Sequence, residues 1–177
     1  MTSDFDATGD EPDESERVRN HLAELGVAHE WMACDPLLAD TAMFCEAYGI
    51  SPQDSANTIL VAGKSDPTTY AACLVLATTK LDVNRVVRRR LGARKASFAS
   101  ADETRSITGM LIGGVTIFGL PAGLPLWIDR QVMARPAIVI GGGSRSWKVK
   151  LDPSGLLALA GVEVVDDLAT PATGQSN

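Results

Sequence analysis

The spacing of strand-like segments in the second half of the chain most constrains its fold. Beyond residue 110, apolar segments follow one another with little helix-forming sequence between them. A doubly wound parallel sheet needs a crossover helix between successive strands. We therefore predict an α+β fold with a mixed, largely antiparallel β-sheet or barrel flanked by helices. The segments are Val115–Phe118, Leu126–Asp129, Ala137–Ile140 and Trp147–Leu151.

Local signals place the remaining elements. Val18, Leu22 and Leu25 recur at helical spacing after Ser15, and a glycine ends this first helix. Helices are also expected from Asp40 to Gly49, from Asp82 to Gly92, from Ser100 to Gly109 and from Asp152 to Ala160. Further strands are expected at Val27–Trp31, Thr58–Ala62, Ala71–Thr78 and, as the last one, Val162–Val165.

One domain accounts for most of the chain. A length of 177 residues is that of an ordinary single domain, and no internal repeat or long linker divides it. Residues 1–14 are acidic and polar, and residues 169–177 are polar and small, so both segments are predicted to be disordered tails. The folded domain is expected over residues 15–168.

The net charge of −6 hides a mildly basic body. Residues 17–160 carry 16 basic and 12 acidic side chains, because the remaining acids lie near the two ends. A local basic face can attract a polyanion even on an acidic protein, although a solvated helix face has the same composition. The sequence leaves both readings open for the basic cluster formed by Arg85, Arg88, Arg89, Arg90, Arg94 and Lys95.

Three cysteines and two histidines limit the chemistry. Cys34, Cys45 and Cys73 cannot all pair and form no CxxC motif, which favours a reducing, cytoplasmic location over a disulfide framework or a zinc knuckle. The histidines form no HxH or HxxxH pair, so no metal site is expected. No apolar run approaches the ~20 residues of a membrane span. Aromatic residues make up only 5%, too few for a surface that stacks bases.

Two glycine clusters could approach a ligand closely. Gly141–Gly143 follow an apolar strand, but a phosphate loop needs a helix directly afterwards, and a strand is expected there. A glycine hairpin or a backbone wall beside a ligand fits better. The second cluster, Gly113–Thr116, could present backbone N–H groups to a developing oxyanion, or it could be a strand bounded by turns.

An ordered series of motifs points to a known family. The motifs are Leu25-Gly26-Val27, Thr41-Ala42, Tyr48-Gly49-Ile50, Leu81-Asp82, Leu91-Gly92-Ala93-Arg94-Lys95, Thr108-Gly109, Gly113-Gly114-Val115-Thr116, Phe118-Gly119-Leu120, Leu126-Trp127-Ile128-Asp129 and Leu151-Asp152-Pro153. In this order, over residues 17–167, the chain resembles the YbaK/prolyl-tRNA synthetase-associated editing domain family, which includes ProX-like deacylases.

The resemblance implies a function as well as a fold. It implies a mixed β-barrel flanked by helices and a pocket between the glycine loop and the strand that begins at Asn57. The expected activity is trans-editing: hydrolysis of the ester of a mischarged tRNA that carries a small amino acid such as Ala, Ser or Cys. The expected partners are this tRNA and, as a second candidate, an aminoacyl-tRNA synthetase, and no cofactor is expected.

The same resemblance supplies the candidate site residues. The catalytic candidates are Asn57, Gly113, Gly114 and Thr116. The substrate-binding candidates are His29, Thr41, Thr58, Phe118, Gly119, Asp129, Gly141, Gly142 and Gly143. The tRNA-binding candidates are Arg85, Arg88, Arg89, Arg94 and Lys95.

This chain departs from the family pattern at four points. Asn57 stands where the family has a lysine, which exchanges a cation for a neutral hydrogen-bonding group. Ile117 replaces a proline, Thr78-Thr79 replaces a Pro-Gly pair, and Gly141 replaces a serine. These changes keep two alternatives open. One is a non-catalytic module that binds tRNA ends, an amino acid or a synthetase, and the other is a hydrolase that uses one of the three thiols.

Overall fold

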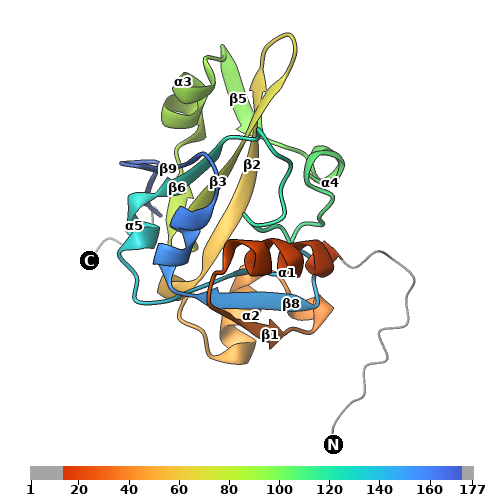
Figure 1. Ribbon diagram of the computed structural model, residues 1–177. Coiled ribbons are helices and arrows are strands. Elements are labelled where there is room, and N and C mark those ends of the chain that lie inside the picture. The colour runs from red at the N-terminus through yellow and green to blue at the C-terminus, as the bar shows by residue number, and fades with distance from the viewer. Residues whose placement is uncertain (1–13, 173–177) are drawn as a thin grey trace, which may run out of the picture.

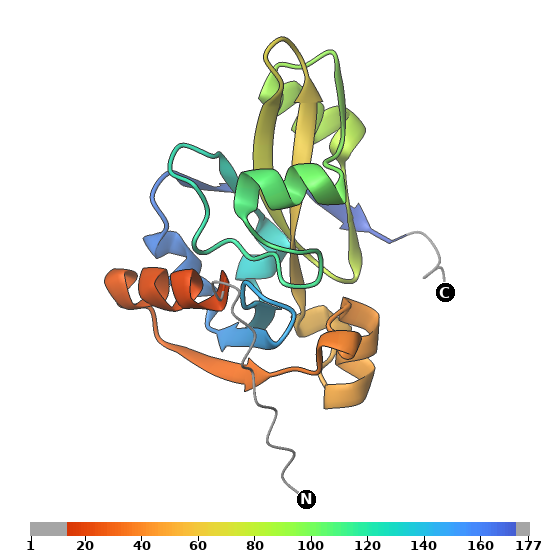
Figure 2. The same ribbon diagram turned by 90° about the vertical axis from the view of Figure 1, so that its right-hand side faces the viewer.

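The computed structural model describes residues 14–172 (Figures 1 and 2). The helices are α1 (Glu14–Leu25), α2 (Thr41–Tyr48), α3 (Arg88–Leu91), α4 (Ala101–Thr108) and α5 (Arg130–Met133), and the shorter 3-10 or π turns are η1 (Pro36–Leu38), η2 (Pro52–Asp54), η3 (Val83–Val87) and η4 (Pro153–Ala158). The strands are β1 (His29–Ala33), β2 (Ala56–Lys64), β3 (Thr69–Leu76), β4 (Thr79–Leu81), β5 (Lys95–Phe98), β6 (Leu126–Asp129), β7 (Ile138–Gly141), β8 (Trp147–Leu151), β9 (Val162–Val165) and β10 (Ala169–Pro171).

A five-stranded sheet in the order β5-β2-β3-β6-β9 forms the centre of the molecule. The side chains of β3 alternate between two hydrophobic cores, as a strand with both faces covered requires. Leu74 and Leu76 lie in the larger core with α1, whereas Cys73 and Val75 lie in the core beneath η3. Burial on both faces explains why β3 is almost wholly apolar in sequence.

A three-stranded sheet, β1-β8-β7, lies with α1 and α2 at one end of the molecule, and β10 pairs with β4 in a small third sheet (Figure 1). Five strand pairs are antiparallel and two are parallel among the described residues, which confirms a mixed, largely antiparallel α+β fold. Of the two predicted forms, sheet or barrel, the described residues form separate sheets and no closed barrel. Among the described residues, the backbone pairing recorded between the central and three-stranded sheets is one isolated bridge, between Ser55 and Val139, so no continuous ladder closes the structure.

The segment Val115–Phe118 is a loop, although its apolar composition predicts a strand. A half-buried strand alternates inward and outward residues, but Ile117 and Phe118 are consecutive and both fully buried. Glycines with positive φ, Gly113 at 94° and Gly119 at 74°, turn the chain on either side. The apolar side chains therefore anchor a loop in the core instead of joining a sheet.

Ordered structure extends into both predicted tails. Glu14 opens α1, and Ala169–Pro171 form β10 by pairing with Leu81–Thr79 of β4. The backbone of β4 supplies hydrogen bonds that the composition of this segment does not suggest. The remainder of both predicted tails lies outside the described residues.

Candidate functional site

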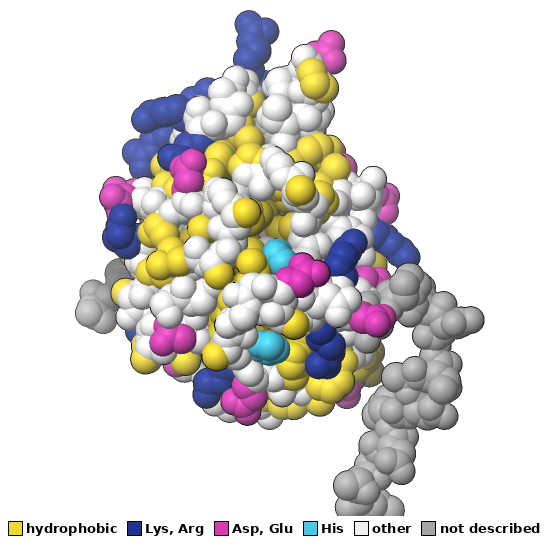
Figure 3. Space-filling model, viewed as in Figure 1, with side chains coloured by type: hydrophobic (Ala, Val, Ile, Leu, Met, Phe, Trp, Pro, Cys, Tyr) yellow, Lys and Arg dark blue, Asp and Glu magenta, His cyan; other side chains and the backbone are white. Residues whose placement is uncertain are grey.

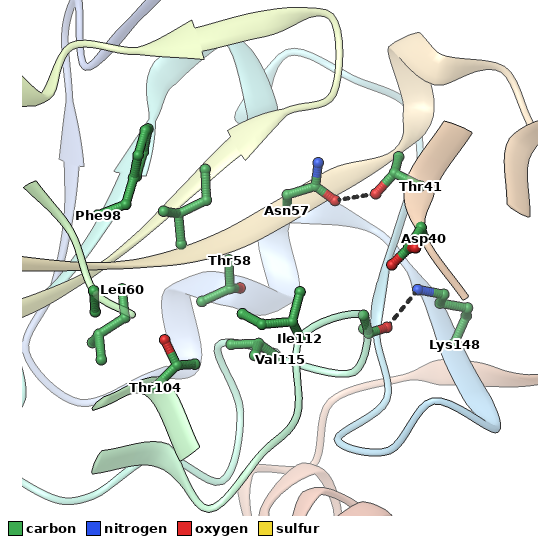
Figure 4. A pocket seen from close by; sticks show the side chains of 14 residues that line it. Asp40, Thr41, Asn57, Thr58, Leu60, Phe98, Thr104, Ile112, Val115 and Lys148 are labelled. Atoms are coloured by element: carbon green, nitrogen blue, oxygen red, sulfur yellow. Dashed lines mark hydrogen bonds between the residues drawn. The ribbon is translucent and has the colours of Figure 1, made fainter. Parts of the chain in front are cut away.

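A cavity of about 320 Å³ opens beside the first half of β2 (Figure 4). Strand β5 pairs with β2 only from Val61 onward, so one edge of β2 is left unpaired by β5 at the start of the strand. The start of α2, helix α4, the loop after α4, and β7 and β8 supply the other walls. The lining residues are Asp40, Thr41, Asn57, Thr58, Ile59, Leu60, Phe98, Ala99, Thr104, Ile112, Gly113, Val115, Gly141 and Lys148.

One end of the cavity is polar. The Thr41 hydroxyl donates a hydrogen bond of 2.7 Å to Asn57 Oδ1. With the Asn57 oxygen facing Thr41, the Asn57 NH₂ group and its two donors are directed away from Thr41 (Figure 4). Asp40 and Lys148 border the same end.

The other end of the cavity is mostly apolar. Leu60, Ile112 and Val115 line it, and Phe98 stands at its rim (Figure 4). The Phe98 and Ile112 side chains are 56% and 53% exposed, so they border an opening rather than a closed core. Within this wall, Thr58 Oγ1 is buried without a hydrogen-bond partner among the described residues. A buried hydroxyl without a partner carries a free-energy cost that a bound polar group would remove.

Lys148 is one of nine lining residues that the sequence reasoning did not name as site residues. It lies on β8 opposite Gly141 of β7, and its side chain is only 7% exposed. Its ammonium donates to the carbonyl oxygens of Ala39 at 2.8 Å and Gly113 at 2.9 Å. Burial lowers the pKa of Lys148 below its ordinary value. The sequence signal that could have identified Lys148 was its place on the strand predicted directly after the Gly141–Gly143 cluster.

The glycine loop is packed against the turn between β7 and β8. A Cβ on Gly114 would lie 2.6 Å from the Ser144 carbonyl carbon, and a Cβ on Gly141 would overlap the Val115 carbonyl oxygen. The Gly143 N–H also donates to the Gly114 carbonyl oxygen at 2.8 Å. Glycine is required here because backbone meets backbone, which is a structural reason for both clusters.

The four catalytic candidates separate in space. Asn57 and Gly113 line the cavity, whereas Gly114 and Thr116 are not among its lining residues. The Gly114 N–H donates to the Leu111 carbonyl oxygen at 2.9 Å, so in this conformation it is not available to an oxyanion. Thr116 is fully buried, and its Oγ1 has no partner within the described part of the chain.

Of the substrate-binding candidates, Thr41, Thr58 and Gly141 line the cavity, and the other six do not. His29 lies on β1, where Nδ1 is 2.7 Å from the Val27 carbonyl oxygen. Phe118 belongs to the larger core. The Gly119 N–H donates to His21 Nδ1 at 2.8 Å. Only part of the predicted substrate-binding set therefore lies at the cavity, and the rest lies elsewhere in the fold.

The remaining candidates also have structural positions. Asp129 ends β6, is 1% exposed and accepts a hydrogen bond of 3.3 Å from the Ala169 N–H, and burial raises its pKa. The Gly142 N–H donates to the Trp147 carbonyl oxygen at 3.0 Å in the β7–β8 turn. Gly143 has a φ of 97° and packs on α1.

The three thiols are buried and free, and none lines the cavity. Burial raises the pKa of Cys34, and it raises the pKa of Cys73 to about 12. A raised pKa keeps a thiol protonated and unreactive at neutral pH. The geometry therefore gives no support to a thiol nucleophile at this site.

Neither a metal cluster nor a membrane helix was found where the structure could be searched. Residues 14–172 contain no group of three His, Cys, Asp or Glu side chains suited to hold a metal ion. Within the same range, every helix is too short or too polar to cross a bilayer.

The basic cluster surrounds η3 and α3, at the end of the molecule where Lys and Arg side chains gather in Figure 3. Arg85 pairs with Asp82 at 3.1 Å, and the Arg88 guanidinium donates to the Asn84 carbonyl oxygen. Arg90 is used within the fold, because it pairs with a glutamate on β9 and lies 4.8 Å from the centre of the Trp127 ring. Within this basic cluster, the exposed cations without a recorded side-chain partner among the described residues are Arg89, Arg94 and Lys95.

Strand β5 connects this basic face to the cavity. Lys95 begins the strand beside the basic cluster, and Phe98 ends it at the cavity rim. Three residue steps along a strand span roughly 10 Å. A polyanion bound at the basic face therefore has a short route to the cavity.

Comparisons with known proteins identify the family and the fold. The aminoacyl-tRNA editing domain family matches residues 35–159, and the chain belongs to this family. The fold is similar to that of a hypothetical protein, with a TM-score of 0.77, 21% identity, and coverage of 87% of this chain and 99% of that one. It is also similar to a candidate trans-editing enzyme for prolyl-tRNA synthetase, with a TM-score of 0.73, 24% identity, and coverage of 88% and 96%. The expected family membership is thus confirmed.

Proposed function

We propose that this protein is a trans-editing deacylase that hydrolyses the ester of a mischarged tRNA carrying a small amino acid. The cavity beside Asn57 is the observation that carries the proposal, because it joins a polar end to an apolar wall in a chain of the editing-domain family. An aminoacyl ester has the same two parts, a polar ester with its amino group and a side chain. A volume of about 320 Å³ suits a small amino acid and part of the terminal nucleoside.

In this proposal, two groups at the polar end of the cavity have roles in ester hydrolysis. The Asn57 NH₂ group, held by Thr41, orients the ester or the terminal ribose. The Gly113 N–H has no hydrogen bond among the described residues. Arg145 holds the Ile112 carbonyl oxygen at 2.7 Å, so the Gly113 N–H of the same peptide points away from Arg145 and serves as an oxyanion donor. Water attacks the ester carbonyl carbon, the bond from that carbon to the ribose oxygen breaks, and a proton passes from the water to that oxygen.

The basic face supplies attraction for the tRNA. Arg89, Arg94 and Lys95 contact backbone phosphates, with Arg85 and Arg88 beside them, and β5 leads from this face towards the cavity. We further propose a cytoplasmic location, since the three cysteines are free thiols. A small cavity that rejects larger cognate amino acids provides the logic of a second sieve.

A deacylation panel tests the proposal. The purified protein is incubated with tRNAs mischarged with Ala, Ser, Cys and larger amino acids, and release of the amino acid is followed. Rapid release from one or two small-amino-acid esters is expected, while esters of large amino acids remain intact. Release at the buffer rate from all of them, by protein with a normal melting transition, would contradict the proposal.

One observation favours a second candidate, a binding module without hydrolysis: Asn57 is neutral where the family it resembles has a lysine. The variant Asn57→Lys separates the two. If Asn57 takes part in hydrolysis, the variant loses activity, because the lysine also breaks the bond to Thr41. If the wild type is a silenced enzyme, the variant gains activity.

A further inference from the structure

Lys148 is a buried cation that the roles assigned above do not use. Among the fourteen described residues that line the cavity, it is the one with a positively charged side chain. Asp40, the acidic lining residue, pairs with Arg145 at 3.3 Å rather than with Lys148. No carboxylate within residues 14–172 lies at ion-pair distance from Lys148, so its charge is held by carbonyl oxygens alone.

The surroundings of Lys148 screen its charge only weakly. The Phe44 ring centre lies 5.3 Å from Nζ, and the buried thiols Cys34 and Cys45 stand on the same side, away from solvent. Arg145 from the β7–β8 turn and Asp40 before α2 are the charged groups that act on it. In a poorly solvated site a charge interacts more strongly with a nearby charge than it does in water.

The ammonium also has bonding capacity left. It carries three N–H donors, and the structure records two hydrogen bonds from them, to Ala39 and Gly113. The bond to Gly113 fixes the peptide that follows the proposed oxyanion donor. Arg145 fixes the peptide that contains the donor itself, because it bonds to the Ile112 carbonyl oxygen of that peptide. Two cations of one hairpin therefore hold two consecutive carbonyl groups of the glycine loop.

We infer that Lys148 is the anion-stabilising residue of this site: its charge favours the negative charge that develops on the ester carbonyl oxygen, and its bond to Gly113 positions the loop that receives that oxygen. This inference rests on the proposed deacylase function. As water adds to the carbonyl carbon, the carbonyl π electrons move to oxygen, and they return when the ribose oxygen leaves. Lys148 stays protonated throughout and exchanges no proton with the substrate. Its role is therefore that of a positioning residue with an electrostatic effect.

Two stable analogues separate the charge effect from a loss of cavity shape. One is an adenosine whose 3′ position carries an aminoalkyl phosphonate, a tetrahedral anion, and the other carries an aminoacyl amide, which is planar and neutral. Affinities are measured by calorimetry for the wild type, for Lys148→Met and for Lys150→Met. The last variant removes an exposed lysine from the same strand and serves as the matched control.

We expect Lys148→Met to bind the phosphonate at least about tenfold more weakly and the amide within about twofold of the wild type, since only the former carries the charge. A tenfold loss corresponds to about 1.4 kcal/mol. In turnover, kcat is expected to fall about 10- to 100-fold with KM nearly unchanged, as for loss of a transition-state contact. Lys150→Met is expected to match the wild type in every measurement.

Three outcomes would overturn the inference. Lys148→Met could bind the phosphonate as tightly as the wild type, it could lose both analogues equally, or the wild type could bind neither. If the wild type hydrolyses no ester but Lys148→Met still loses phosphonate binding selectively, the deacylase function is refuted and the anion site remains in place. A wild type that hydrolyses esters as fast as Lys148→Met does would refute the role of Lys148 alone.

Discussion

The hydrogen bond between Thr41 and Asn57 makes a quantitative test of the site possible. Thr41→Val keeps the shape of the side chain but removes the hydroxyl that donates to Asn57 Oδ1 at 2.7 Å. A single neutral hydrogen bond contributes about 1 kcal/mol. If that bond holds the Asn57 amide in its productive orientation, its loss corresponds to about a fivefold decrease in kcat/KM. The melting temperature should fall by only about 2–4 °C.

The assay measures single-turnover deacylation and thermal melting for Thr41→Val beside Thr41→Ser. The serine variant retains the hydroxyl and is expected to keep most of the activity, because the donor can still reach Asn57. Wild-type activity in Thr41→Val would refute the reasoning, since Asn57 would then need no partner. Equal losses in both variants would refute it as well, because Thr41→Ser keeps the hydroxyl and its loss could not come from a missing hydrogen bond.

The remaining predictions concern pH, packing and salt. Burial lowers the folded-state pKa of Lys148, so between that pKa and about 10.5 the unfolded chain binds more protons than the folded one. In urea unfolding, the stability of the wild type relative to Lys148→Met should therefore rise with pH through that range. Deacylation should fall over the same range, because the ammonium loses its proton. Gly114→Ala places a methyl group 2.6 Å from the Ser144 backbone and should cost about 1–3 kcal/mol in thermal melts, whereas Gly161→Ala, with no atom within 4 Å, should lose only about 1 kcal/mol from its positive φ. Replacing three exposed cations by alanine should reduce the slope of log Kd for tRNA against log salt by about 2–3, while Lys150→Ala leaves it nearly unchanged; equal slopes would exclude this face as the tRNA contact. The three cations are Arg89, Arg94 and Lys95.

Elements with local boundary signals were predictable from the sequence. The helix expected after Ser100 begins with a capping box, in which Ser100 and Glu103 bond to each other's backbone N–H, and it ends at Gly109 with a φ of 72°. The strands Leu126–Asp129 and Trp147–Leu151 have the predicted bounds. In each case the deciding interactions lie within a few residues along the chain, or the apolar pattern is unambiguous.

Elements that depend on distant partners were not predictable. Strand β10 forms because β4 offers it an unpaired edge, and Val115–Phe118 is a loop because the core admits two consecutive side chains. Lys148 was missed for the same reason. A strand pattern indicates which residues share a face, but only the packing of Ala39 and Gly113 against that face turns a surface-type residue into a buried one.

The family pattern located about a third of the cavity lining. Asn57, Thr41, Thr58, Gly113 and Gly141 were named in advance and line one space. The roles assigned to these residues remain predictions. Phe98 and Lys148 were not named, because neither belongs to a motif and both reach the cavity through tertiary packing.

The isolated bridge between Ser55 and Val139 has a consequence for how this cavity can adapt. The wall that carries Asn57 belongs to one sheet, and the wall that carries Lys148 belongs to the other. A small slide of one sheet past the other would change the width between these walls while every ladder within each sheet stays intact. Substitutions along this seam, outside the lining itself, can therefore change the width of the cavity, and the two walls can diverge in sequence independently.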